Sequence, residues 1–176
     1  IKLFLEKKTK ISYAGTLDPF ATGVLIIAIG KKNTKKISQF QNLDKTYQFT
    51  IQLGTQTSTL DPEGDITITK PVDNTLNKEK IETITKQFIG SIEQTPPDYS
   101  AKKINGVRAY KLARQNKPVT LKPVTITIKN LTILEYNPQT QLISCRVTCS
   151  KGTYIRSLSR DIAIKLGTVG YTKTLV

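Results

Sequence analysis

The chain has 176 residues, which is enough for one domain with a sizeable core. Its 27 Lys and Arg residues against 13 Asp and Glu residues give a formal net charge of +14, which attracts phosphate backbones but also occurs on lysine-rich surfaces with no specific partner. The longest apolar run, Val24 to Ile29, is far too short to span a bilayer, which argues against a membrane protein.

The first part of the chain predicts a turn followed by strands. Residues 1–12 show no complete element, so we expect them to be the end of one that begins earlier. A turn containing Gly, Asp and Pro follows at 15–19. The uninterrupted apolar run 24–29 predicts a strand covered on both faces. Apolar and polar residues alternate over 45–53, which predicts a half-buried strand with one polar face.

The remaining segments mix helices with strands. A turn at 61–64 leads to a second alternating run around Ile66. Helical spacing of apolar residues predicts a helix near 81–89 and another over 155–166, each followed by a glycine that can end it. A short helix is expected within 106–116.

Two later segments, 124–128 and 143–149, alternate as paired strands do. Because helices and strands do not alternate strictly along the chain, we expect an α+β fold. Its sheet should be mixed but mostly antiparallel, with helices flanking it.

The two cysteines, Cys145 and Cys149, lie four residues apart in one of these alternating runs. In a strand that spacing is about 13 Å, whereas a disulfide needs Cα atoms within about 7 Å. We therefore expect both to be reduced packing residues, as suits a cytoplasmic protein. The sequence has no histidine, and with only two cysteines we expect no zinc or other metal site.

Asp18 stands in the most distinctive segment of the chain, where Gly15-Thr16-Leu17-Asp18-Pro19 is soon followed by Thr22-Gly23-Val24-Leu25. The following proline favours an extended backbone, and a loop held on a rigid base can present one carboxylate at a defined point. An isolated Asp-Pro, however, is more often a turn residue that bonds its own backbone.

Four blocks in chain order resemble the motifs of the TruB family of tRNA pseudouridine-55 synthases, in its bacterial form. They are Gly15 to Leu25; Lys45-Thr46-Tyr47 with Leu53-Gly54 and Asp61 to Gly64; Gln94 to Lys103 with Gly106, Arg108, Ala109, Tyr110, Ala113 and Arg114; and Cys149 to Leu158. The resemblance covers essentially the whole chain. Any one block would be moderate evidence, but four in order make a chance match improbable.

The resemblance implies a pseudouridine-synthase-like fold and an isomerase. In that reaction a T-loop uridine of tRNA, at position 55, is detached at N1, turned, and rejoined to ribose through C5, with no cofactor. The target base must first leave its stack. The resemblance also implies a cytoplasmic protein that acts on the T arm of tRNA, and we expect a monomer.

The matching positions assign the roles. Asp18 is expected to be the nucleophile or general catalyst, and Arg156 its catalytic partner, which keeps the carboxylate charged and oriented through a bidentate pair at the floor of a basic cleft. The expected substrate-binding residues are Tyr47, Tyr154, Leu175 and Tyr13. Weaker candidates for contacts to the RNA backbone are Lys10, Lys102, Lys103, Arg108 and Lys151.

The sequence departs from the family pattern in places. Tyr13 stands where the family normally has His, and Ser12 where it has Gly. Tyr can stack and form hydrogen bonds but carries no positive charge near neutral pH. The family's opening Lys-Pro motif and everything after Val176 are missing. We therefore expect residues 1–176 to be a catalytic domain that lacks this N-terminal motif and any C-terminal RNA-binding domain.

Three other interpretations remain. The nearest alternative is an RNA-guided synthase of archaeal or eukaryotic type, but the sequence of residues 20–25 resembles the bacterial form of the motif. A non-catalytic RNA-binding protein or tRNA chaperone could use the same scaffold, although intact Asp18 and Arg156 argue against it. A basic ribosome-associated structural protein would explain the charge and not the four blocks.

Overall fold

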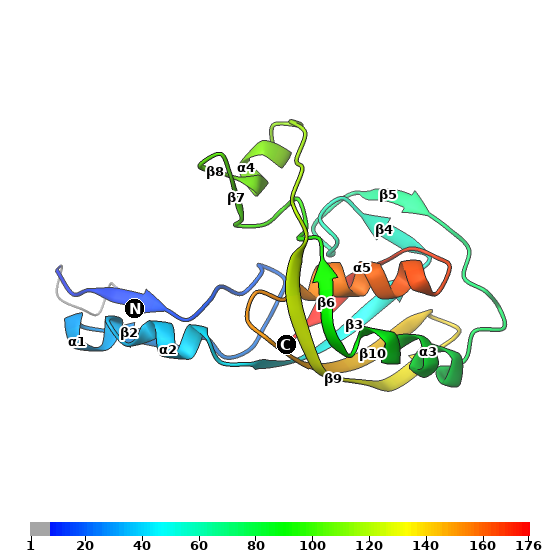
Figure 1. Cartoon of the computed structure of the whole chain (residues 1–176). Helices are drawn as coiled ribbons and strands as arrows, with labels where there is room; N and C mark the ends of the chain where they lie inside the picture. The colour runs from blue at the N-terminus through cyan, green and yellow to red at the C-terminus, as the bar shows by residue number, and fades with distance from the viewer. Residues whose placement is uncertain (1–7) are drawn as a thin grey trace.

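A five-stranded sheet forms the centre of the computed structural model, which describes residues 8–176 (Figure 1). The order is β11-β3-β10-β9-β6, formed by Gly170–Leu175, Lys45–Leu53, Leu142–Cys149, Val124–Asn137 and Gly90–Gln94. The expected α+β class is confirmed. Every pair of neighbouring strands in this sheet is antiparallel, however, so the expected mixed character is absent from the described strands. The expectation for residues 1–7 lies outside the described residues.

Two helices cover one face of this sheet. They are α3 (Lys78–Thr85), which continues into the 3-10 turn η2 (Lys86–Phe88), and α5 (Ile155–Lys165). Fully buried Leu158 and Ile162 of α5 lie in one core with alternate residues of β3 such as Ile51, while Gln48 of that strand is exposed. Three predictions are therefore confirmed: the strand over 45–53, the pairing of the two later alternating segments (β9 with β10), and the two longer helices.

The first elements of the described chain form an arm that extends away from the sheet, at the left of Figure 1. It consists of β1 (Ile11–Tyr13), β2 (Ile27–Ile29), α1 (Lys31–Thr34) and α2 (Ile37–Gln41). The expected doubly covered strand over 24–29 is wrong. Only its last three residues form a strand, β2 pairs with β1 alone among the described strands, and Val24 is 92% exposed. An apolar run indicates where burial is favourable but cannot supply the layers that would cover it.

A lobe stands above the sheet between β6 and β9. We use this name for residues 98–122, which contain β7 (Lys103–Ile104), β8 (Val107–Arg108) and α4 (Ala109–Ala113). The expected short helix within 106–116 is therefore confirmed. Beside the lobe lies a hairpin of β4 (Thr55–Thr57) and β5 (Ile66–Thr69), whose turn contains Asp61.

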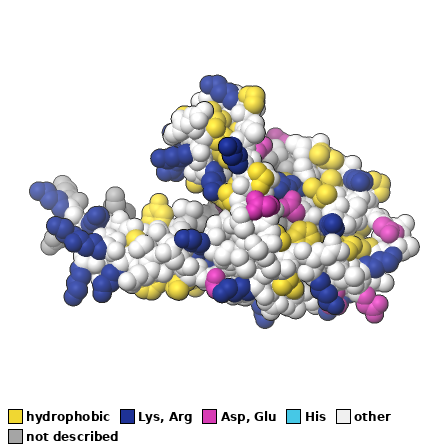
Figure 2. Space-filling view, in the orientation of Figure 1, with side chains coloured by type: hydrophobic (Ala, Val, Ile, Leu, Met, Phe, Trp, Pro, Cys, Tyr) yellow, Lys and Arg dark blue, Asp and Glu magenta, His cyan; other side chains and the backbone are white. Residues whose placement is uncertain are grey.

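Lysine and arginine side chains gather on the arm and the lobe on the face shown in Figure 2. Positive charge therefore lies on the two parts of the molecule that project from the sheet, the arm and the lobe. Among residues 8–176, no helix is long and apolar enough to cross a membrane.

Candidate active site

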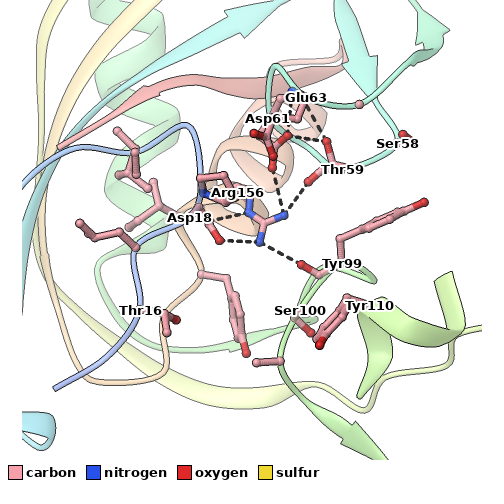
Figure 3. A pocket seen from close by; sticks show the side chains of 18 of the residues that line it. Thr16, Asp18, Ser58, Thr59, Asp61, Glu63, Tyr99, Ser100, Tyr110 and Arg156 are labelled. Carbon is pink, nitrogen blue, oxygen red and sulfur yellow. Dashed lines mark hydrogen bonds and ion pairs between the residues drawn. The ribbon is translucent and has the colours of Figure 1, made fainter. Parts of the chain in front are cut away.

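A cavity of about 690 Å³ opens where the β1–β2 loop, the β4–β5 turn, the lobe and the start of α5 meet. Five of the residues expected at the site line it, although they come from four distant parts of the sequence. They are Asp18, Tyr47, Tyr154, Arg156 and Leu175. Figure 3 shows Asp18 and Arg156 side by side in this cavity.

The carboxylate of Asp18 and the guanidinium of Arg156 form a bidentate ion pair. Nε of Arg156 donates to Oδ2 of Asp18 at 2.8 Å, and Nη2 donates to Oδ1 at 3.0 Å. The Arg156 side chain is 6% exposed, whereas that of Asp18 is 35% exposed. A buried cation therefore fixes both oxygens of a carboxylate that remains accessible from the cavity.

The remaining donors of Arg156 are also occupied. Nη1 donates to the carbonyl oxygen of Thr59 at 2.8 Å and to Oδ2 of Asp61 at 3.2 Å. Nη2 donates to the carbonyl oxygen of Tyr99 at 3.0 Å. With two bonds to Asp18, all five N–H groups of the guanidinium have acceptors, so its plane is fixed by three separate segments (Figure 3).

Asp61 is itself held by its turn. Its Oδ1 accepts hydrogen bonds from the Thr59 hydroxyl and from the backbone N–H of Glu63, and its side chain is only 4% exposed. A Cβ added at Gly64 would lie 2.4 Å from Oγ1 of Thr59, so glycine permits this close approach. Leu60 adopts a φ of 61°, a strained value for a bulky residue that the surrounding contacts must maintain.

The loop that carries Asp18 is tied to the sheet. The backbone N–H of Ala21 donates to the carbonyl of Asp18 at 2.9 Å, which closes a tight turn. The N–H of Thr22 donates to the carbonyl of Leu175 at 3.0 Å, which joins the loop to β11. Phe20 and Ala21 pack against the core. These contacts supply the rigid base that the sequence led us to expect.

Two tyrosines form aromatic walls of the cavity. Burial, with smaller contributions from Cys149 and Asp18, raises the pKa of Tyr47 to about 12. Burial also raises the pKa of Tyr154, against the opposing effects of Ser100 and Arg156. Both phenols therefore stay neutral at physiological pH and can stack on a base or share a hydrogen bond without carrying charge.

The backbone of Tyr154 is held by a buried glutamine. Oε1 of Gln94 accepts from the N–H of Tyr154 at 2.8 Å, and Nε2 of Gln94 donates to its carbonyl at 3.2 Å. Gln94 is 1% exposed, and it ends strand β6. This amide satisfies both backbone groups of Tyr154 and fixes the start of α5, from which Arg156 projects.

The structure does not bring the other expected residues to the cavity. Tyr13 lies on β1, is 52% exposed and is not among the lining residues. Its strand pairs Tyr13 with Ile27 on the arm, and the carbonyl of Tyr13 accepts from Gln41. The expected RNA-backbone residues are all exposed and outside the lining: Lys10, Lys102, Lys103, Arg108 and Lys151.

The lining is not basic, which corrects the expectation of a basic cleft. It includes the carboxylates of Asp18, Asp61, Glu63 and Asp65 and the guanidiniums of Arg114 and Arg156. Arg114 is the one lobe cation in this lining, and the lysines of the arm and lobe lie outside it (Figure 2). Within the part of the chain that the structure describes, no three His, Cys, Asp or Glu side chains are grouped to hold a metal ion.

Comparison with known proteins gives the family. The model of the TruB family pseudouridylate synthase N-terminal domain matches residues 2–155. This chain belongs to the TruB family. Two curated relatives are both named tRNA pseudouridine synthase B. That of Bacteroides fragilis is 49% identical over 89% of this chain and 65% of the relative. That of Phocaeicola vulgatus is 47% identical over 97% of this chain and 71% of the relative.

A third TruB-family relative, from Aquifex aeolicus, is 46% identical over 96% of this chain and 58% of its own length. The chain thus spans roughly two thirds or less of several of its curated relatives. Among solved structures, one chain of a Cbf5-Nop10-Gar1 complex is similar, at 26% identity and a TM-score of 0.66. The match covers 94% of this chain and 39% of the matched chain. An H/ACA RNP bound to a substrate RNA containing 2′-deoxyuridine matches at 25% identity and a TM-score of 0.62, over 94% of this chain and 37% of that chain.

The site also contains residues that the sequence did not assign. Asp61 appeared only as part of a turn motif, and the carbonyl groups of Thr59 and Tyr99 were not considered. No local signal distinguishes these acceptors, because their role depends on an arginine 57 to 97 positions away. Their position inside two TruB-like blocks was the one available indication.

Proposed function

We propose that this chain is the catalytic domain of a tRNA pseudouridine synthase that isomerises a T-loop uridine of tRNA, at position 55. The observation that carries the proposal is the accessible Asp18 carboxylate held by a bidentate Arg156 in a TruB-family chain. The names of the relatives, tRNA pseudouridine synthase B, support tRNA as the substrate. The lobe and arm, which carry much of the exposed positive charge, lie where an RNA backbone could pass the cavity.

The reaction breaks the bond between N1 of uracil and C1′ of ribose, and it forms a bond between C5 and C1′. The proton on C5 is lost and N1 gains one, so the product has the same composition as the substrate. Asp18 acts on the flipped nucleotide as nucleophile or general base. Arg156 holds both oxygens of this carboxylate in one place, and because Arg156 is already buried and fully bonded it needs no rearrangement during the reaction.

The walls of the cavity serve the flipped base. Tyr47 lines the cavity, and in this proposal it stacks on the uracil ring; stacking of a base on an aromatic side chain is worth about 1–3 kcal/mol. Tyr154 and Leu175 close the other sides. Neutral phenols suit this role because uracil is itself uncharged. Tyr13 has no part in this assignment, since it lies on the arm.

The setting of the protein follows from the same assignment. We propose that it acts as a monomer in the cytoplasm on the T arm of tRNA, with no cofactor. Both cysteines, Cys145 and Cys149, are free and buried, which is consistent with a reducing compartment.

The test is to incubate the purified protein with an unmodified tRNA transcript and to map pseudouridine at single-nucleotide resolution. Product at one T-loop uridine supports the proposal. Asp18→Asn provides the control for contaminating activity, because a nearly isosteric amide lacks the nucleophilic and basic character of the carboxylate. RNA binding without any product would instead favour the non-catalytic RNA-binding alternative, and scattered product would point to another family member's specificity.

A further inference from the structure

The side chain of Ser100 is the one buried polar side chain, among the described residues, whose oxygen has no hydrogen-bond partner. Ser100 is only 4% exposed, yet it belongs to the lining of the cavity that contains Asp18. Buried hydroxyl groups almost always have a partner, because burial without one loses the hydrogen bonds that water provides. Ser100 departs from this rule, and it lines the same cavity as the Asp18 carboxylate, so its unpaired hydroxyl needs a physical explanation.

The position of Ser100 is set by bonds on both sides of it. The carbonyl of Tyr99, which precedes it, accepts a hydrogen bond from Nη2 of Arg156 at 3.0 Å. The carbonyl of Ser100 itself accepts from the backbone N–H of Tyr110, the second residue of α4, at 3.1 Å. Ser100, near the start of the lobe, is therefore held between the ion pair and α4, and Figure 3 shows it beside Tyr110 at the cavity wall. Its unpaired hydroxyl cannot be explained by a loose loop.

The nearest polar groups do not supply the missing hydrogen bond to the Ser100 hydroxyl. The Ser100 hydroxyl lies close enough to Tyr154 to act on that phenol's pKa, in the lowering direction, but the two oxygens form no hydrogen bond of normal geometry. Both oxygens of Asp18 accept from Arg156, which also donates to the carbonyl of Tyr99, and none of these groups bonds the Ser100 hydroxyl. Tyr154 is therefore the nearest candidate partner, but the Ser100 hydroxyl has no hydrogen bond of normal geometry to any described protein group.

We propose that the Ser100 hydroxyl binds the flipped nucleotide, through a hydrogen bond to the ribose 2′-hydroxyl or to a polar atom of uracil. This inference rests on the proposed function and names one residue beyond it. Because this oxygen is inaccessible even to water, a ligand atom reaches it only when the neighbouring side chains shift as the nucleotide is seated. The bond therefore forms after the RNA has bound, and its loss affects the chemical step more than RNA affinity.

Substitution separates this role from a structural one. Ser100→Ala removes an unsatisfied buried group, so the midpoint of thermal unfolding should stay unchanged or rise. The single-turnover rate constant at saturating tRNA should fall by roughly three- to tenfold, as expected for one neutral hydrogen bond, with the dissociation constant for tRNA nearly unchanged. Ser100→Cys keeps a similar volume with a weaker donor, and it should give an intermediate rate.

Ser159→Ala is the matched control. Ser159 is equally buried, but its hydroxyl accepts a hydrogen bond from Thr172 at 2.8 Å on the side of α5 that faces β11. This substitution should lower the unfolding midpoint and leave the single-turnover rate constant unchanged. The two buried serines should therefore show opposite patterns of stability and activity.

The partner is identified with a substrate that carries 2′-deoxyuridine at the target position. If Ser100 binds the 2′-hydroxyl, Ser100→Ala should have no further effect on this substrate; if it binds uracil, the full effect should persist. Both results support the proposal. It is overturned if Ser100→Ala and Ser100→Cys keep the wild-type rate constant, or if the effect disappears in a Tyr154→Phe background, which would make Tyr154 the partner. Absence of product with the wild-type protein would instead reject the proposed function and this inference with it.

Discussion

Asp61 binds Nη1 of Arg156, the guanidinium nitrogen that Asp18 leaves free. The two carboxylates thus hold one arginine from different sides, with Nη1 to Oδ2 of Asp61 at 3.2 Å and Nε to Oδ2 of Asp18 at 2.8 Å. Asp61 and Arg156 are both nearly inaccessible, whereas Asp18 is open to the cavity. In the proposed reaction this arrangement makes Asp61 a positioning residue for the Asp18 carboxylate.

Asp18→Asn should abolish pseudouridine formation while the fold and tRNA affinity remain. The amide has nearly the same shape but is neither nucleophilic nor basic. Circular dichroism and tRNA binding would report the intact fold and complex, and single-turnover mapping would report the chemistry. Substantial turnover by the purified variant would show that another residue performs the step.

Arg156→Lys should reduce the single-turnover rate constant by about a hundredfold or more, because an ammonium group cannot form the bidentate pair or bind three carbonyl and carboxylate acceptors at fixed angles. The free energy of unfolding should fall by about 1–3 kcal/mol, since buried acceptors lose their partners. Arg160→Lys is the control, because Arg160 bonds its neighbour Asp161 and a carbonyl at the surface. Equal losses in the two variants would contradict a special role for Arg156.

Asp61→Asn should lower the rate constant by about tenfold or more without weakening tRNA binding, because it removes the charge that orients Nη1 of Arg156. An asparagine oxygen can still accept from Thr59 and Glu63, so the turn should persist. Rate constants of Asp61→Asn, of Arg156→Lys and of the double variant would form a double-mutant cycle, in which non-additive losses show that the two residues act together. Wild-type turnover by Asp61→Asn would show that Arg156 is oriented by its carbonyl contacts alone.

The affinity for tRNA should fall steeply with salt, because positively charged side chains that contact phosphates release counterions. Replacing the exposed arm residues Lys31, Lys32 and Lys35 by Gln should flatten this dependence, by up to about one unit of slope for each phosphate that is no longer neutralised. The matched control replaces Lys78, Lys80 and Lys86 by Gln, which removes the same charge from α3 and η2 on the other side of the sheet. Equal flattening by both sets would mean that only net charge matters.

Tyr47→Phe should change the response of stability to alkaline pH. The folded protein holds the pKa of Tyr47 near 12, above its ordinary value of 10.0, because burial disfavours the phenolate. The folded state therefore keeps a proton that the unfolded state loses, so this stabilisation is complete below pH 10 and is lost as the pH rises toward 12. Urea unfolding across this window should show a smaller loss for Tyr47→Phe than for the wild type. The exposed control is Tyr13→Phe, which should follow the wild type.

Local pattern determined much of the fold. The alternation that ends at Leu53 predicts β3 with its bounds, because burial of one face of a strand is written in every second residue. The helical stripe after Tyr154 predicts α5 for the same kind of reason. The run beginning at Val24 misled the prediction, since an apolar segment shows no sign of whether another layer covers it.

At the site, the sequence by itself, through its resemblance to the TruB family, predicted the residues: a carboxylate at Asp18, an arginine at Arg156, and tyrosines at Tyr47 and Tyr154. Only the tertiary structure decided the partners. Asp61 reaches Arg156 across 95 positions and Gln94 reaches Tyr154 across 60, and the unpaired Ser100 is visible only once its surroundings are folded. Hydrogen-bond partners depend on distances of about 3 Å, which sequence spacing does not specify once the chain has turned back on itself.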